Sequence, residues 1–484
     1  MCREGRTHEA YNLAKADMEQ QLSWAQREMG WVLYYLIKDD SDAGNYQSLV
    51  SHLDELNSLD QLSIPYDNNL FECVLYKVAE FVKKHLQPES LDTCTRLSEL
   101  FLKLQHYDFE PSRGYSFLLQ SFIKCGNWDD MADFIDWWNL DKLLQDDYLP
   151  FRTESGRSII SLAERAYIAK SKALMRLNDL GRIEEFLPQM ENLVECHPEM
   201  IYPNYFYGKL LLSLGRNREE ALRVILPFAR RKASEFWVWQ LLGELFADEP
   251  DKELACLLRA ANSRTSENYL IKVRTKLAAL YIDRSMLGHA KYQIKQVIKC
   301  CMSNHWGLPS EIASWIHQPW IESVEEDNHE TLDYMGISNS ILCEGTEETI
   351  AVVTQIVHET NKVVLVYGYQ KSIKQKLRLR VNLGDVLKIN YIIDPDGTLR
   401  ILNAVKTQLA SGLNYAKMVR GVIRKRADKD FAFLHTANGD YFMSPDIVNR
   451  SNIEDGMRLR CLAVYCYNPK KDYWDWKCMS VFSY

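Results

Sequence analysis

The sequence has no apolar stretch long enough to cross a membrane. The longest strongly apolar run is Trp31–Ile37, whereas a membrane helix needs about 20 residues. The first residues, Met1–Arg6, lead into a mixed polar segment without the apolar core of a signal peptide. The 12 cysteines are scattered and follow no disulfide framework. These absences predict a cytoplasmic protein with reduced thiols.

Proline and glycine are also scarce, with 14 and 21 in 484 residues, which argues against long disordered linkers. A chain of this length exceeds one hydrophobic core, and about 150 residues per domain gives roughly three units. Residues 346–484 carry 21 Lys and Arg against 14 Asp and Glu, a net of +7, whereas residues 1–345 carry 37 against 52, a net of −15. A basic end on an acidic body predicts different partners for the two parts.

The short motifs of several enzyme classes are missing. The chain has no Gly-x-x-x-x-Gly-Lys nucleotide loop, no Gly-x-Ser-x-Gly elbow and no His-Glu-x-x-His zinc motif. His305, His317 and His329 have no spacing typical of a metal site. Cys461 and Cys466 would lie on opposite faces of a strand. We therefore expect neither catalysis, nor a bound metal, nor another cofactor.

A period of 35 residues runs through the middle of the chain. Four small residues recur at this interval, namely Ala173, Gly208, Gly243 and Ala278. A second small residue follows three of them, at Ala221, Ala255 and Ala290, whereas Glu185 takes that place in the first repeat. Two helices pack closely only where side chains are small, so the period predicts a series of helix pairs. The alternative is a helical bundle with accidental spacing.

This pattern resembles the tetratricopeptide repeat family, clearly over about 130 residues and loosely over about 300. The resemblance implies an all-α solenoid over residues 1–300, whose concave groove binds a protein or peptide. In the family, side chains of the first helix of each pair line the groove. Here these are Tyr167, Lys170, Tyr202, Tyr205, Lys209, Trp237 and Lys272. The alternative is that Tyr202, Tyr205 and Trp237 only pack between repeats.

Residues 301–345 interrupt the repeat and read as a helical connector. A short helix is expected over residues 310–315, with Ser310 as its cap. The acidic stretch Glu322–Glu330 is expected to be a solvated loop. The tryptophans expected to seal the last repeat are Trp306, Trp315 and Trp320.

From Thr349 onward the pattern is that of short β-strands. Strands rich in Val, Ile and Tyr are expected at 350–357, 362–369, 386–393 and 398–405, with a turn at 394–397. Five short strands in about 60 residues predict an OB-like barrel over residues 346–410. The plan repeats over residues 411–484, with strands at 417–426, 430–436, 440–444, 458–467 and 473–482.

The second of these β modules resembles a cold-shock domain. That family opens with a Gly-x-Val-Lys strand, and Gly421–Arg424 fits it. Its Lys-Gly-Phe-Gly-Phe-Ile motif is echoed by Lys429–Leu434, and its Asp-Val-Phe-Val-His motif by Asp440–Ser444. The sequence departs from the family at Ser444, where the family has His, and at Lys425 and Arg426, where it has aromatic residues.

The resemblance implies an exposed aromatic face that stacks bases, since strand parity places Phe431 and Phe433 on one side. The residues assigned to this face are Phe431, Phe433 and Phe442, with Arg424, Lys425, Arg426 and Lys429 for phosphates. The alternative is that Phe431 or Phe433 belongs to the core. In the first module, Lys371–Arg380 alternates basic and apolar residues, which predicts a strand that tracks phosphates or a solvated edge.

Two functions remain open. One is a non-enzymatic adaptor that binds RNA or single-stranded DNA through the β modules and a protein through the helical groove, similar to bacterial proteins that join these module types. The other is a pure protein scaffold whose β modules bind no nucleic acid.

Overall fold

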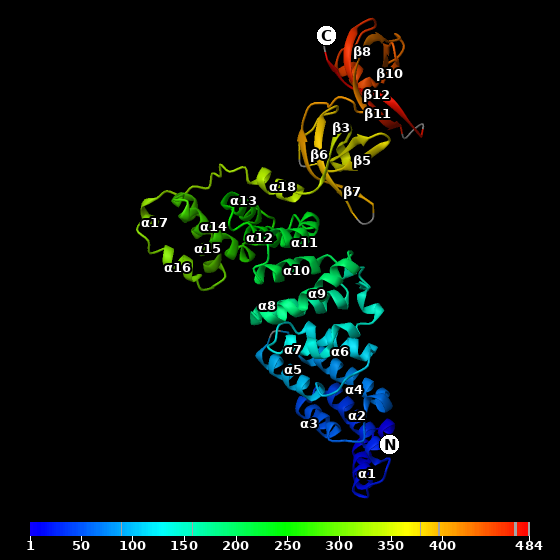
Figure 1. The fold of residues 1–484 in the computed structure, drawn as a ribbon, viewed down its shortest axis with the longest axis vertical. Helices are drawn as coiled ribbons and strands as arrows, with labels where there is room; N and C mark the ends of the chain where they lie inside the picture. Colours follow the sequence, from blue (N-terminus) through cyan, green and yellow to red (C-terminus); the bar gives the residue numbers. More distant parts are fainter. Residues whose placement is uncertain (89, 157, 378, 395–396, 469–471, 483–484) are drawn as a thin grey trace. The chain divides into compact units, whose positions relative to one another are not determined.

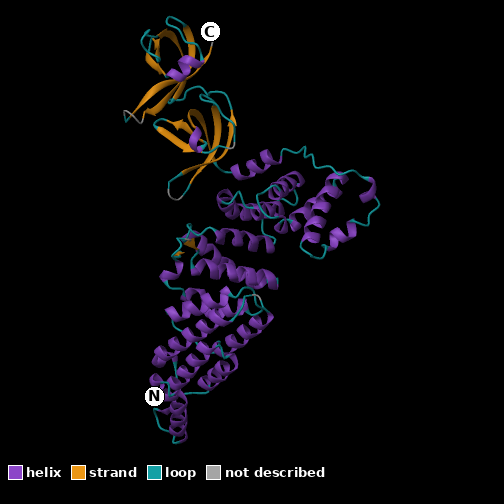
Figure 2. Cartoon of the chain, turned by 180° about the vertical axis from the view of Figure 1, so that it is seen from behind, coloured by secondary structure: helices purple, strands orange, loops and turns teal. Residues whose placement is uncertain are grey.

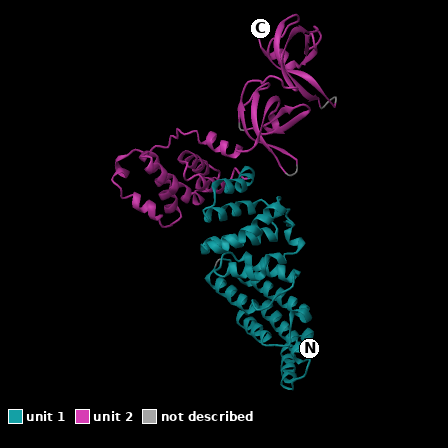
Figure 3. Cartoon of the chain, in the orientation of Figure 1, with its two compact units in different colours: residues 1–231 teal, residues 232–484 magenta. Residues whose placement is uncertain are grey.

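Helices fill the N-terminal and central parts of the chain, and strands fill its C-terminal end (Figures 1 and 2). The structure is a computed structural model that describes residues 1–482 apart from 89, 157, 378, 395–396 and 469–471. It divides into two units, Met1–Arg231 and Lys232–Tyr484 (Figure 3). Within the described ranges, no helix is both long and apolar enough to span a lipid bilayer. A helical region followed by a β-rich region confirms the predicted order.

The first unit is mainly helical. Its α-helices are α1 (Thr7–Glu19), α2 (Ala25–Ala43), α3 (Tyr46–Asn57), α4 (Ile64–His85), α5 (Leu91–Leu104), α6 (Arg113–Lys124), α7 (Met131–Trp138), α8 (Leu162–Leu177), α9 (Leu180–Cys196), α10 (Tyr202–Ser213) and α11 (Arg218–Arg231). Short 3-10 helices lie at η1 (Cys2–Glu4), η2 (Leu140–Lys142) and η3 (Gln145–Tyr148), and β1 (Phe151–Arg152) pairs with β2 (Ser158–Ile159).

Side-chain caps fix where several of these helices begin. The hydroxyls of Ser90, Ser112 and Ser161 accept hydrogen bonds from backbone N–H groups at the starts of α5, α6 and α8. The carboxylate of Asp179 does the same for α9. Each cap satisfies a donor that the helix itself leaves unpaired, which stabilises a helix by about 1 kcal/mol.

The second unit begins with further helices. They are α12 (Phe236–Leu245), α13 (Pro250–Ala261), η4 (Glu267–Tyr269), α14 (Ile271–Asp283), α15 (Leu287–Ser303), α16 (Ser310–Trp315), α17 (Trp320–Ser323) and α18 (Tyr334–Cys343). Arg259 of α13 joins α18 to this bundle. Its guanidinium lies 3.9 Å from the Trp239 ring centroid and donates to Ser338 Oγ over 2.9 Å.

Helices occur where the 35-residue period predicts them, as α8–α9 and α10–α11 in the first unit and α12–α13 and α14–α15 in the second. The small residues occupy the tight positions. Ala173 and Ala278 are fully buried, and a side chain at Gly208 would begin 2.2 Å from Ile225 Cγ1. The small residues therefore lie where paired helices pack closely, as the sequence predicted. Membership of the tetratricopeptide family stays a prediction.

Two predictions for the connector are wrong. Ser310 is the first residue of α16 and gives no cap, because Pro309 takes the cap position and the Ser310 hydroxyl donates to Glu311. Trp306 is half-exposed. Trp315 and Trp320 pack against the core of α14 and α15, and so two of the three expected tryptophans cover the last helix pair.

The acidic segment Glu322–Glu330 is mostly an exposed loop, as predicted, and it also contacts α15. Lys291 Nζ donates to the carbonyl oxygen of Val324 over 2.7 Å, and the Asp327 N–H donates to the carbonyl oxygen of Gly288 over 3.2 Å. Side-chain contacts also join Lys295 to Glu326 and Tyr281 to Glu330. The partners lie more than 30 residues upstream of the segment, and the local composition of the segment therefore gave no indication of them.

The first β module is a five-stranded sheet with the order β5-β4-β3-β6-β7. Its elements are β3 (Glu347–Val357), η5 (His358–Thr360), β4 (Lys362–Gly368), β5 (Lys371–Gln375), β6 (Val386–Ile393) and β7 (Leu399–Lys406). The predicted barrel is not closed by a ladder among the described residues. Instead, Gln375 at the end of β5 accepts a hydrogen bond from the backbone N–H of Ile401 in β7 over 3.3 Å. Residues 395–396 of the predicted turn lie outside the described residues.

The second β module is a closed barrel with the order β10-β12-β11-β8-β9. Its elements are β8 (Ala416–Arg424), β9 (Ala432–Thr436), β10 (Gly439–Met443), α19 (Pro445–Arg450), β11 (Arg458–Asn468) and β12 (Tyr473–Phe482). The two modules share one strand order, as the repeated plan predicts. Gly384 and Gly456 make the turn into the fourth strand of each, with φ of 82° and 78°.

One buried cluster joins the two β modules. Val352 and Val366 of the first module are packed with Leu462, Val464 and Met479 of the second. The Tyr415 hydroxyl also donates to the carbonyl oxygen of Ile350 over 2.7 Å, and burial raises the pKa of Tyr415. Shared burial of this kind holds two small domains together as a tandem.

Candidate nucleic-acid interface

Three phenylalanine rings meet on the outside of the closed barrel. Phe433 of β9 pairs with Phe442 of β10 in the antiparallel ladder, and their ring centroids are 5.7 Å apart. Phe431, just before β9, lies 5.9 Å from the Phe433 ring and 5.8 Å from the Phe442 ring. We name these residues the phenylalanine cluster. The structure therefore brings together the three aromatic residues that the sequence assigned to one face.

Strand parity directs the cluster outward. The alternate residues Ala432, Leu434, Tyr441 and Met443 belong to the buried core of the barrel. Phe433 remains 37% exposed, although burial of a full aromatic side chain stabilises a protein by about 1.5–3 kcal/mol. Phe431 and Phe442 are half-buried, and none of the three phenylalanines is a member of the buried core, so the cluster lies at the surface with Phe433 as its most exposed ring.

Cations lie around the cluster, though not all those predicted. Arg424 pairs with Phe433 across β8 and β9, which places it on the same face. Arg426 and Lys429 are exposed in the loop before β9, and Lys429 lies 3.6 Å from Asp428. These three side chains are available to phosphates.

Lys425 has a different role from the predicted one. Its Nζ donates to the carbonyl oxygen of Ile453 over 3.1 Å, and its backbone N–H donates to Asp455 Oδ1 over 2.8 Å. Lys425 therefore ties the end of β8 to the loop before β11. Its charge is engaged within the barrel, which argues against a phosphate contact.

Sequence reasoning missed Lys477. This residue of β12 pairs with Phe442 where β10 and β12 run in parallel, so it shares the outer face with the phenylalanine cluster. The cold-shock-like motifs end at Ser444, 33 residues before Lys477. The third and fifth strands are neighbours in this barrel, and that strand order would have pointed to Lys477.

The corresponding face of the first β module is covered. Val366 of β4 is buried in the cluster shared with the second module, and Val364 is half-buried. Of the predicted cationic strand, β5 spans only Lys371–Gln375, where Lys371 and Lys374 are exposed. Arg378 lies outside the described residues. The first module thus has an exposed basic edge at β5. On β4, valines stand at positions 364 and 366, so this strand offers no aromatic ring there for stacking.

The predicted groove residues differ in exposure. Tyr167 is 5% exposed and Lys170 is 8% exposed; Lys170 Nζ lies 2.6 Å from Asp136 Oδ1. These two therefore pack between helices, and their assignment to an open groove is wrong. The half-buried residues are Tyr202, Tyr205, Lys209 and, in the second unit, Trp237, whereas Lys272 of the second unit is exposed.

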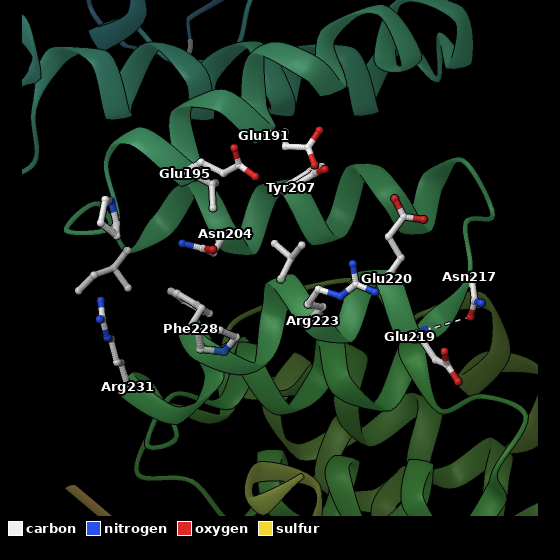
Figure 4. A pocket seen from close by; sticks show the side chains of 15 residues that line it. Glu191, Glu195, Asn204, Tyr207, Asn217, Glu219, Glu220, Arg223, Phe228 and Arg231 are labelled. Atoms are coloured by element: carbon white, nitrogen blue, oxygen red, sulfur yellow. Dashed lines mark hydrogen bonds between the residues drawn. The ribbon is translucent and has the colours of Figure 1, made fainter. Parts of the chain in front are cut away.

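A cavity of about 710 Å³ lies between α9, α10 and α11 (Figure 4). Tyr207 of α10 lines it. None of the predicted groove residues lines the cavity, although the Tyr205 ring lies 5.6 Å from the ring of Phe228, which does. Its labelled polar side chains include Glu191, Glu195, Glu219, Glu220 and Arg223, and the sequence reasoning had singled out none of them.

Two stretches of the chain match known families. Residues 417–481 match a family described as S1/CSD-like domain 2 of the TOTE conflict systems. The β-rich end contains an S1/CSD-like domain. This finding confirms the cold-shock likeness at that level and gives this end of the chain nucleic-acid-binding potential. Residues 201–337 match a domain of unknown function, DUF7017. No curated protein matches the chain.

Proposed function

We propose that the chain is a non-enzymatic adaptor that binds single-stranded RNA or DNA through the phenylalanine cluster. The observation that carries this proposal is the cluster itself, with three rings within 5.7–5.9 Å of one another on the outside of an S1/CSD-like barrel. Arg424 and Lys477 flank it on neighbouring strands. This arrangement suits a ligand that has flat aromatic bases and a negatively charged backbone.

Single strands are favoured over duplexes because the bases of a duplex are already stacked. An open ring on the protein gains energy only from a base with a free face, and such stacking contributes about 1–3 kcal/mol per base. The cations add affinity that does not depend on base identity, because phosphate contacts release bound counterions. Weak sequence preference is therefore expected, with strong dependence on salt.

The test is fluorescence anisotropy of the full chain with labelled single-stranded RNA and DNA of about ten nucleotides, in a salt series. Phe433→Ala is expected to weaken binding by roughly five-fold to a hundred-fold, in line with the loss of one stacked base. Because Phe433 is partly exposed and outside the barrel core, the variant is expected to fold normally, as checked by thermal melting.

Phe433→Trp is the matched control, since it keeps an aromatic face and is expected to retain binding. A folded wild-type chain that binds neither strand at low salt would sink the proposal. That result would favour the alternative function, a protein scaffold whose β modules contact only other proteins.

The helical region is proposed to hold the protein partner of the adaptor. Two places there could meet a partner: the half-buried Tyr205 on α10, and the cavity of Figure 4, which is lined by Phe228, the ring against which Tyr205 packs. A pull-down with the full chain tests the two places. Loss of the partner with Tyr205→Ala alone points to the Tyr205 surface, and loss with Arg223→Ala alone points to the cavity. The matching family belongs, by its description, to the TOTE conflict systems, and we extend that setting to this chain.

A further inference from the structure

A two-stranded ribbon projects from the closed barrel. The ladder between β11 and β8 ends where Val464 pairs with Ala416, and β12 meets β10 at Lys477. Beyond these points the strand ladder joins 465–468 only to 473–476 among the described residues, although the Tyr465 N–H donates to the carbonyl oxygen of Tyr415 over 2.8 Å. A lone two-stranded ribbon is marginally stable in water; here the buried Cys466 and the half-buried Tyr465 and Trp474 anchor the base of the ribbon on the cluster that joins the two modules.

One face of the ribbon is aromatic. Tyr465 pairs with Trp476 and Tyr467 pairs with Trp474 across the two strands, with ring centroids 5.5 Å and 5.8 Å apart. Tyr465 and Trp474 are stacked at 6.0 Å with 26° between their planes. Tyr369, in the turn between β4 and β5 of the first module, is parallel to Tyr465 within 6° at 5.0 Å. We name Tyr369, Tyr465, Tyr467 and Trp474 the aromatic row.

Two members of the aromatic row are exposed, whereas Tyr465 and Trp474 are half-buried against the cluster that joins the two modules. Tyr369 is 51% exposed and Tyr467 is 42% exposed. Cross-strand aromatic pairs stabilise a ribbon, but the stabilisation comes from apolar area removed from water. Rings that keep about half of their surface in water therefore have faces that folding does not use. The Tyr369 hydroxyl also raises the pKa of Tyr465 through a hydrogen bond.

Lysines lie near the aromatic row, together with the exposed Asp472 and Asp475 of the ribbon itself. Lys417 Nζ lies 4.2 Å from the Trp476 ring centroid, and Lys371 and Lys374 are exposed on β5, which follows Tyr369. The ribbon also carries Asp472, which accepts a hydrogen bond from the Tyr467 hydroxyl over 2.5 Å. Open ring faces beside lysines are the combination that single-strand-binding surfaces use.

We propose that the aromatic row is a second base-stacking platform, which takes nucleotides of a strand already held by the phenylalanine cluster. The inference rests on the proposed function and extends it. Tyr369 comes from the first β module, so this module contributes to binding although its own sheet face is covered. A long strand then contacts both platforms, whereas a short one is held by the phenylalanine cluster alone.

The experiment compares labelled strands of about six and about 20 nucleotides, because one OB-type domain covers about 4–16 nucleotides. The full chain carries Tyr369→Ala together with Tyr467→Ala. Binding of the long strand is expected to weaken at least five-fold, and binding of the short strand to stay unchanged. Phe433→Ala is expected to weaken the binding of both strands.

Tyr467→Phe is the matched control, since it keeps the ring and loses only the hydrogen bond to Asp472; it is expected to bind like the wild type. Tyr369→Leu keeps an apolar side chain without an aromatic face, and it is expected to weaken long-strand binding even if the double variant unfolds. A folded Tyr369→Leu chain that binds the long strand as tightly as the wild type overturns the second platform and leaves the proposed function standing. A wild-type chain that binds neither strand overturns both.

Discussion

Phe442 of β10 lies opposite Lys477 of β12 at the point where the two strands pair in parallel and close the barrel. Residues opposite each other in a ladder point to the same face, so the Lys477 ammonium shares the outer surface with the phenylalanine cluster. On the other side, Arg424 lies opposite Phe433. The cluster is thus flanked by a cation on each side, as a stacked strand with phosphates along its edges requires.

The first prediction concerns Lys477. Lys477→Ala removes one phosphate contact, which is expected to weaken binding of a single strand a few-fold at low salt. It should also reduce the slope of log affinity against log salt by about 0.7, the value for one contact to a single strand. Lys477→Arg keeps the charge and should behave like the wild type. An unchanged slope in the alanine variant would show that Lys477 makes no phosphate contact.

The second prediction separates two adjacent cations. Arg426→Ala is expected to lower the salt dependence of binding without affecting stability, because Arg426 is exposed. Lys425→Ala is expected to lower the stability by about 1 kcal/mol, because the carbonyl oxygen of Ile453 loses its donor. The salt dependence of binding is expected to stay unchanged in this variant. Anisotropy in a salt series and thermal melting, applied to both variants, give the two readouts. Equal salt slopes for the two variants would contradict the assignment.

Lys425 also shows what the sequence could not reveal. Strand alternation predicted which residues of the β modules face outward, because side-chain direction has a period of two and the pattern is local. The same period predicted that Phe431 and Phe433 share a face, whereas Phe442 was assigned from the resemblance to the cold-shock family. The partner of Lys425 lies 28 residues away in a loop, and nothing in the local pattern points to it. Lys425 therefore resembled Arg426 in sequence although its contacts differ.

The same limit applies to the elements that depend on distant partners. The strand at Val386–Ile393 was predicted with its observed bounds, whereas α19 was not predicted and α18 lies in a stretch predicted only as a helical connector. α18 is held by Arg259, about 80 residues earlier. Tyr167 was placed in a groove by analogy, but its burial follows from packing against Phe186 of the next helix. Such contacts are set by the tertiary fold rather than by periodicity.

The third prediction concerns pH. Hydrogen bonds from Lys77 and Lys84 lower the pKa of Glu80 to about 2, with nitrogen–oxygen distances of 2.6 Å. A carboxyl pKa that is lower in the folded state stabilises the fold above the unfolded value of 4.5, and the stabilisation is lost as pH falls toward about 2. All three side chains are partly exposed, so each pair contributes only about 0.2–1 kcal/mol.

Glu80→Gln is therefore expected to lower the urea midpoint of the helical region slightly at neutral pH, by the equivalent of about 1 kcal/mol. The difference from the wild type should shrink as the pH falls below 4.5 and vanish near 2. Helical circular dichroism at several pH values measures it. Glu110→Gln, at an exposed loop position, is the control. A difference that persists at the lowest pH would mean that the charge of Glu80 is not the cause.

The fourth prediction concerns the acidic segment on α15. A side chain at Gly288 would begin 2.9 Å from the carbonyl oxygen of Glu325, a backbone atom that cannot turn away. Gly288→Ala is therefore expected to displace the segment from α15 while leaving the helix intact, since alanine favours helices. A glutamate-specific protease should then cut at Glu325 and Glu326 several-fold faster. Gly307→Ala is the control, because a side chain there meets nothing within 4 Å. Equal cleavage rates for Gly288→Ala and the wild type would mean that the segment accommodates the extra carbon without leaving the helix, and that contacts such as Lys291 with Val324 hold it in place despite the shift.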